Sequence, residues 1–107
     1  MKLHFSYHSK LKTAEEYKRI LEDYATDKKL SGLSRLLQHG NYELADFDVR
    51  VEPLAHRSGL LIKMDLEVKK HVLHAESEGY NPIEVFDLAL EKIIIQLRKV
   101  ESVRHDK

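Results

Sequence analysis

With 107 residues, the chain is long enough for one domain with a single core and too short for two. Hydrophobic residues at 42% and charged residues at 34% exclude the low-hydrophobicity composition of a disordered protein. Eighteen basic residues balance eighteen acidic ones, which excludes a uniformly basic nucleic-acid binder but leaves room for a basic patch on one face. We predict one domain over residues 1–107.

The sequence carries no sign of a membrane or an oxidising compartment. No stretch approaches the roughly 18 apolar residues of a membrane span, and the amino terminus lacks the apolar segment of a secretory signal. The absence of cysteine excludes disulfides and thiolate chemistry. We therefore expect a cytoplasmic protein without a membrane partner.

The first predicted element is a strand over residues 2–8, where every second residue is apolar. A helical region follows, and the T-x-x-E pattern of Thr13 and Glu16 marks its start. Gly40 marks its end.

The apolar positions of this helical region change phase part-way along it. Its first half has one helically spaced set, Tyr17, Ile20, Leu21 and Tyr24. Its second half has another, Leu30, Leu33 and Leu37. A single straight helix cannot bury both sets on one side, so we expect an interruption or bend near residues 26–32.

Three more strands follow, each with alternating apolar and polar residues, over 45–52, 60–68 and 72–77. The last two are expected to form a hairpin with Lys69 and Lys70 at its turn. The final helix begins at the N-cap pattern Asn81-Pro82 and runs to about residue 102.

The order β-α-β-β-β-α predicts an α+β fold, a four-stranded sheet with two helices packed on one face. The polar residues of the strands would then line the bare face of the sheet. Acids dominate them: Asp46, Asp48, Glu52, Asp65, Glu67 and Glu76, against Lys2, Arg50 and Lys63. That face should repel phosphate.

Nothing in the sequence predicts catalysis, a metal, a cofactor or a small-molecule substrate. Side chains four apart on a strand, such as His4 and His8, lie about 13 Å apart, and His71 and His74 would point to opposite faces of theirs. No phosphate loop, nucleophile elbow or H-E-x-x-H pattern is present.

Charge is distributed unevenly along the last helix. Residues 81–91 hold three acids and no base, whereas residues 92–107 hold five bases and two acids. This polarity suits the helix macrodipole and also a local RNA-binding surface, and the residues alone leave both interpretations open.

The stretch LHAESEGYNPIEVFDLALEKIIIQLRK resembles a known family, the ribosome hibernation-promoting factors, also called ribosome-associated inhibitors or sigma-54 modulation proteins. The corresponding family pattern reads like I-H-A-x-A-E-G-x-D-M-Y-x-A-I-D-L-A-x-D-K-L-x-R-Q-L-x-K. The positions that match are His74, Ala75, Glu78, Gly79, Asp87, Leu88, Ala89, Lys92, Gln96, Leu97 and Lys99. The family's fold is the same β-α-β-β-β-α order, and this chain is similar to its short form.

The resemblance implies a protein that binds the small ribosomal subunit at the decoding region, in the channel for mRNA and tRNA, and inhibits translation in stationary phase or stress. It implies rRNA contacts by basic residues on the helices. By position these are Lys92 and Lys99 first, then Arg98, Arg104, Lys28, Lys29, Lys69 and Lys70.

One alternative is an enzyme of the α+β sandwich type that uses histidine, and two others have no catalytic activity. One of these two is a double-stranded-RNA-binding module of α-β-β-β-α order, which needs a basic cluster where residues 81–91 are acidic. The other is a homo-oligomeric interaction module, whose contact surface would be the outer face of the last helix.

Three consecutive isoleucines, Ile93, Ile94 and Ile95, fan out over about 200° of that helix. We expect Ile93 in the core, Ile94 at the margin and Ile95 on the outside together with Leu88. Family members usually carry a charged residue at the position of Ile95, so we expect Leu88 and Ile95 to form a partner contact.

Overall fold

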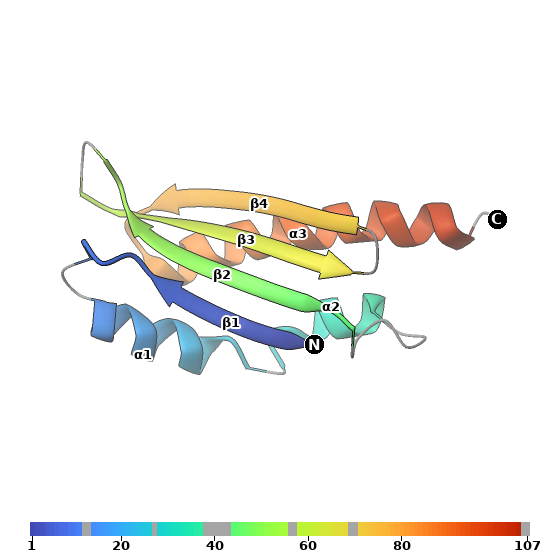
Figure 1. Ribbon diagram of the computed structural model, residues 1–107, viewed down its shortest axis with the longest axis horizontal. Helices are drawn as coiled ribbons and strands as arrows, with labels where there is room; N and C mark the ends of the chain where they lie inside the picture. The colour runs from blue at the N-terminus through green and yellow to red at the C-terminus, as the bar shows by residue number, and fades with distance from the viewer. Residues whose placement is uncertain (12–13, 27, 38–43, 56–57, 69–70, 106–107) are drawn as a thin grey trace.

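Four strands form one sheet in the computed structural model, which describes residues 1–11, 14–26, 28–37, 44–55, 58–68 and 71–105, with side chains up to Val100. The strands are β1 (Lys2–Tyr7), β2 (Asp46–Pro53), β3 (Leu60–Val68) and β4 (His71–Gly79). Their order is β1-β2-β3-β4, with β1 parallel to β2 and the other neighbours antiparallel (Figure 1). The predicted strands and the β3–β4 hairpin are confirmed.

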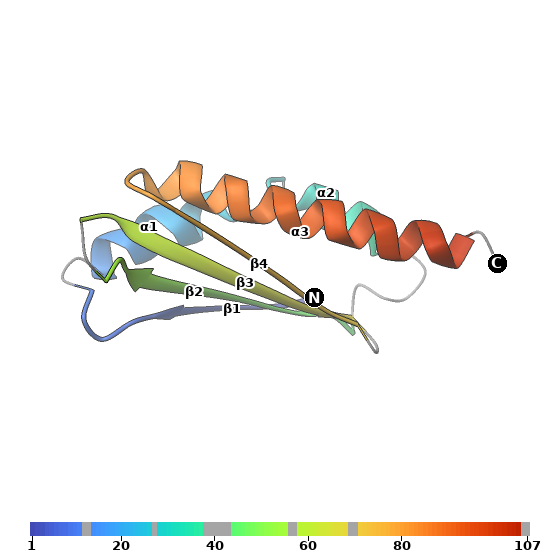
Figure 2. The ribbon, with the colours of Figure 1, turned by 90° about the horizontal axis from the view of Figure 1, so that it is seen from above.

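Three helices lie together on one face of this sheet (Figure 2). They are α1 (Ala14–Tyr24), α2 (Ser31–Leu36) and α3 (Pro82–His105). The α+β fold is therefore confirmed, and so is the interruption of the first helical region. The count of two helices is corrected to three segments, because the chain between Tyr24 and Ser31 turns and lets each half bury its own apolar residues. Thr13 and Gly40 lie outside the described residues.

The core fills the space between the sheet and the helices. Alternation places Phe47 and Val49 of β2 and Ile62 and Met64 of β3 fully inside it. Phe86 of α3 packs onto this layer, and the Phe5 ring of β1 stacks beside it with centroids 6.4 Å apart. The apolar residues of the strands and those of the helices thus face the same core.

The short α2 is held by leucines rather than by its own length. Leu30 and Leu33 are buried, as is Leu37 just after the helix. Gly32 faces α3 so closely that a Cβ there would lie 3.2 Å from Cδ1 of Ile94. Six residues would not form a stable helix in water, so the buried leucines and the close contact with α3 together hold α2 in place.

The helix α3 begins where the sequence predicts. The side-chain oxygen of Asn81 accepts hydrogen bonds from the backbone N–H groups of Ile83 and Glu84, at 3.0 and 3.3 Å, and Pro82 takes the first position. No helix among the described residues is both long and apolar enough to cross a membrane.

The three isoleucines of α3 meet three environments. Ile93 is fully buried against the sheet, Ile94 is half-buried under α2, and Ile95 is 45% exposed. Leu88, two turns earlier, is 42% exposed. The predicted distribution is confirmed.

The bare face of the sheet carries the acids expected there, and its charges pair diagonally. Asp48 stands directly opposite Asp65, and Arg50 opposite Lys63, so both direct pairs have like charge. The bases reach diagonally instead: Arg50 to Asp65 at 3.0 Å and Lys63 to Glu52 at 3.4 Å. These exposed pairs offset the like-charge repulsion between neighbouring strands.

The hydroxyl of the half-buried Tyr7 joins β1 to α1. Tyr7 donates a hydrogen bond of 3.0 Å to the carboxylate of Glu22. Burial raises the pKa of Tyr7 well above its usual value of 10.0, and the hydrogen bond to Glu22 raises it further. The hydroxyl therefore stays protonated and available as a donor.

Replacing Gly59 by alanine should destabilise the fold. Its φ of +119° is one that residues with a side chain rarely adopt, and an added Cβ would lie 2.8 Å from the carbonyl oxygen of Gly79. We expect Gly59→Ala to lower the free energy of unfolding by about 1–3 kcal/mol, measured by urea denaturation. Ser58→Ala, at the adjacent exposed position, is the control and should change it little. Equal stability of the two variants would contradict the strain argument.

Candidate RNA-binding surface

The predicted rRNA-binding residues that the structure describes all lie on the helical side of the molecule. Lys28 and Lys29 lie between α1 and α2, and Lys92, Arg98 and Lys99 lie on α3. The turn residues Lys69 and Lys70 lie outside the described residues, and Arg104 lies in the last turn of α3 with its side chain outside them. The described cations are thus opposite the acidic face of the sheet.

A groove between α2 and α3 brings two of these cations together. It has a volume of about 510 Å³, and Lys29 and Arg98 lie along it with the carboxylates of Asp87 and Glu91. Gly32, which has no side chain, and the half-buried Ile94 form the apolar part of the groove. Residues far apart in sequence therefore share one polar groove.

Lys29 is held by an ion pair inside the protein. Its ammonium lies 2.8 Å from the carboxylate of Asp87 and 5.0 Å from the centre of the Tyr24 ring. The Tyr24 hydroxyl donates to the same carboxylate at 2.8 Å. The hydrogen bond to Asp87 raises the pKa of Lys29, with a smaller effect from Tyr24. Asp87 therefore ties the segment before α2 to α3.

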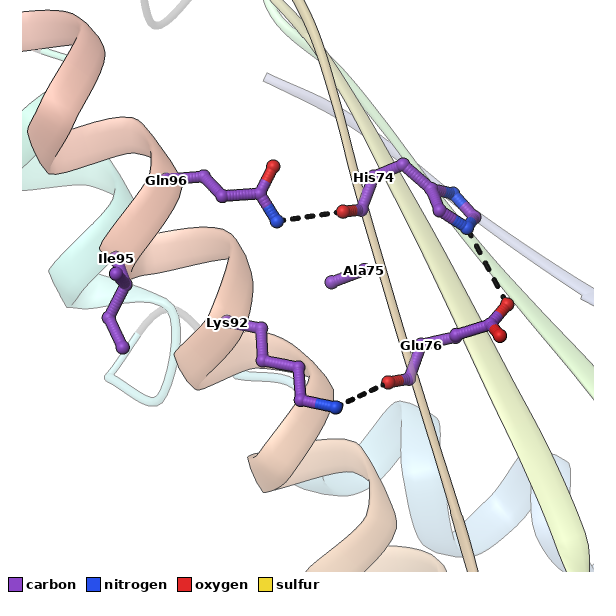
Figure 3. A pocket seen from close by; sticks show the side chains of 6 residues that line it. All are labelled: His74, Ala75, Glu76, Lys92, Ile95 and Gln96. Atoms are coloured by element: carbon purple, nitrogen blue, oxygen red, sulfur yellow. Dashed lines mark hydrogen bonds and ion pairs between the residues drawn. The ribbon is translucent and has the colours of Figure 1, made fainter.

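Lys92 and Gln96 occupy the free edge of the sheet (Figure 3). The Lys92 ammonium donates a hydrogen bond of 2.8 Å to the carbonyl oxygen of Glu76, and the Gln96 amide donates one of 2.7 Å to that of His74. Lys92 and Gln96 are four residues apart, a rise of about 6 Å in a helix. His74 and Glu76 are two residues apart, a rise of about 6.7 Å in a strand, so donors and acceptors have nearly the same spacing. These side chains satisfy outward carbonyls of β4 and thereby protect the sheet edge.

Arg98 and Lys99 have no such internal role. Both are exposed, and neither side chain forms a hydrogen bond or ion pair with any residue that the structure describes. The same holds for the Lys28 side chain. Binding a phosphate would cost these three cations no existing partner, whereas Lys29 and Lys92 would have to share or give up theirs.

Sequence reasoning did not assign the connecting roles of Asp87 and Gln96, although both match the family pattern. Their partners, Tyr24 and the His74 carbonyl, lie 63 and 22 residues away in sequence. Only the fold brings them together. Among the described residues, no group of three or more histidine, aspartate or glutamate side chains is arranged to hold a metal ion.

The protein-family model described as "Sigma 54 modulation protein / S30EA ribosomal protein" matches residues 16–104. The chain belongs to this family. The resemblance to the ribosome hibernation-promoting factors is thereby confirmed, and the chain is a member of a ribosome-associated protein family. A comparison with curated protein sequences finds no match.

Two solved structures share the fold of this family member. The N-terminal domain of Protein Y from Thermus thermophilus has a TM-score of 0.59 at 14% identity, over 94% of this chain and 99% of that one. A ribosomal subunit interface protein from Coxiella burnetii has a TM-score of 0.60 at 11% identity, over 95% and 99%. The α-β-β-β-α alternative lacks the first strand, which here pairs in parallel with β2.

Removing the carboxylate of Asp87 should loosen α2. We expect Asp87→Ala to lower the free energy of unfolding by about 1 kcal/mol, since its partly exposed contacts are screened, as measured by chemical denaturation. Because the pKa of Lys29 is raised, the contribution of the ion pair is full below the ordinary lysine value of 10.5 and declines above it. Glu91→Ala, one turn further on the same helix, is the control. A loss that appears only at acid pH would refute this assignment.

Removing both donors at the β4 edge should also cost stability. The double variant Lys92→Met, Gln96→Met keeps long helix-forming side chains but leaves two carbonyls to water, so we expect a loss of roughly 1–2 kcal/mol in the free energy of unfolding. Hydrogen exchange in β4 should quicken with it. Lys99→Met is the matched control, because Lys99 has no described partner. Unchanged exchange in the double variant would show that the edge needs no such donors.

Proposed function

We propose that this protein acts as a single ribosome-binding domain that binds the small ribosomal subunit at the decoding region and inhibits translation in stationary phase or stress. It would occupy the channel that mRNA and tRNA otherwise use, and it would do so in the cytoplasm. Family membership supports a ribosomal partner. The observation that carries the RNA contact is the pair of unpartnered cations Arg98 and Lys99 on the outer face of α3.

The charge distribution supports the helical face as the one that would meet rRNA. The open sheet face is dominated by carboxylates and would repel phosphate, whereas the segment before α2 and the second half of α3 present Lys28, Arg98 and Lys99. RNA in A-form is recognised by its shape and by contacts to phosphates and 2′-hydroxyls. Such recognition needs cations on a rigid scaffold and no catalytic group, so we propose a binding role without enzymatic activity or cofactor.

Lys92 and Lys29 remain proposed rRNA contacts, but they are weaker candidates than Arg98 and Lys99 because both already have partners within the protein. Their ammonium groups already stabilise β4 and the α2 segment. A substitution at either position would therefore weaken the fold and the binding together. The proposal is tested most cleanly at positions that carry no internal contact.

Neutralising Arg98 and Lys99 should weaken binding to the small subunit. We expect the double variant Arg98→Gln, Lys99→Gln to bind at least about tenfold less tightly at low salt, and its slope of log K against log salt to fall by about two. Cosedimentation with purified small subunits in sucrose gradients, repeated over a salt series, measures both. In a translation assay the variant should inhibit correspondingly less.

The matched control is Lys18→Gln, Arg19→Gln. It removes the same charge from exposed positions of α1, where Glu15, Glu22 and Asp23 surround them. This variant should bind like the wild type. If wild-type protein fails to cosediment at low salt, the proposed function is wrong; if both double variants lose binding equally, the contact is not located at Arg98 and Lys99.

A further inference from the structure

A stripe of alternating acidic and apolar residues runs along the outer face of α3. Glu84, Leu88, Glu91 and Ile95 are spaced four, three and four residues apart, which aligns them on one side of the helix. We call these four residues the crest. They point away from Phe86, which is buried against the sheet.

The side chains of the crest have no polar partner among the residues that the structure describes. Leu88 is 42% and Ile95 45% exposed. Neither the Glu84 nor the Glu91 side chain forms a hydrogen bond or ion pair with any residue in the described part of the chain. Single exposed apolar residues need no explanation, but here two stand two turns apart on one stripe with two free carboxylates.

Ile95 stands between two hollows. On one side lies the groove towards β4, with a volume of about 520 Å³, lined by Ala75, Lys92 and Gln96 (Figure 3). On the other lies the groove towards α2, where Glu91 and Arg98 take part in the lining. Each hollow is large enough for a side chain of a partner. Apolar side chains of a partner could therefore pack on either side of Ile95.

RNA is a poor match for the crest itself. Phosphates would be repelled by Glu84 and Glu91, and a helical RNA surface offers no apolar area to Leu88 and Ile95. A protein surface that carries lysine or arginine beside apolar side chains satisfies both kinds of residue. We propose that the crest docks onto such a basic and apolar protein surface of the small ribosomal subunit.

This inference rests on the proposed function and refines it. The bases Lys92 and Lys99 flank the crest on its β4 side, where Lys92 lines the groove towards that strand. Arg98, which lines the groove towards α2, follows the crest along the helix. We therefore expect rRNA to meet Arg98 and Lys99 at the end of the crest, and a ribosomal protein to meet the crest itself. The apolar contact supplies affinity that does not decline with salt as phosphate contacts do.

The first experiment replaces the apolar residues without changing charge or helix propensity. Leu88→Gln, Ile95→Gln should bind intact small subunits about tenfold less tightly, while its affinity for protein-free rRNA of the same subunit stays within about twofold of wild type. Val72→Gln is the control, because Val72 is an apolar residue 66% exposed outside α3. It should bind both targets like the wild type.

The second experiment removes the two carboxylates of the crest and measures whether binding to the subunit weakens or strengthens. Removing carboxylates strengthens binding to RNA and weakens binding to a basic protein. We expect Glu84→Gln, Glu91→Gln to bind intact subunits several-fold more weakly. Tighter binding of this variant would overturn the proposal and assign the crest to RNA.

The other outcomes are equally distinct. Equal loss for intact subunits and for protein-free rRNA in the Leu88 and Ile95 variant would mean that these residues pack on bases, which overturns the proposal. A wild-type dimer that this variant dissolves, seen by sedimentation velocity, would assign the crest to a second copy of the chain and also overturn it. No wild-type binding to subunits at all would instead refute the proposed function on which the inference rests.

Discussion

Burial of one side of α3 against the sheet is the constraint on which the rest of the structure depends. Phe86, Ala89, Ile93 and Leu97 occupy successive turns and fix the rotation of the helix about its axis. Once that rotation is set, every other residue of α3 has an assigned direction. Lys92 and its neighbours meet the edge of β4, other residues meet α2, and the remainder face solvent.

Polar side-chain contacts on the β4 side and on the α2 side stabilise this orientation of α3. On the β4 side, Lys92 and Gln96 satisfy carbonyls that would otherwise form an open sheet edge. On the α2 side, Asp87 gathers Tyr24 and Lys29, which anchors a helix too short to stand alone. Three polar positions that match the family pattern thus serve the fold first, which separates them from the free cations Arg98 and Lys99.

Charge is separated between the two faces of a protein with no formal net charge. Carboxylates concentrate on the open face of the sheet, where the bases among them are largely used in diagonal ion pairs. The cations Lys28, Arg98 and Lys99, which have no partner among the described residues, lie on the helical layer. In the proposed function, such a layout would orient the molecule on rRNA and limit nonspecific adhesion, because the opposite face would repel phosphate. A rigid two-layer scaffold and this polarity together are all that shape-directed RNA binding requires.

The sequence by itself determined the strands, the interrupted first helical region and the distribution of Ile93, Ile94 and Ile95, because period-2 and period-3.6 patterns report burial directly. It also determined the family, through a motif in one continuous stretch. Tertiary structure alone decided which cations are free. The hydrogen bond from Lys92 to Glu76 and the ion pair of Lys29 with Asp87 join residues distant in sequence, and local patterns carry no information about such partners. The sequence already placed Leu88 and Ile95 on the outer face of the last helix, and the fold added that no described residue covers them. Local patterns cannot show such an absence, because covering residues can come from any part of the chain.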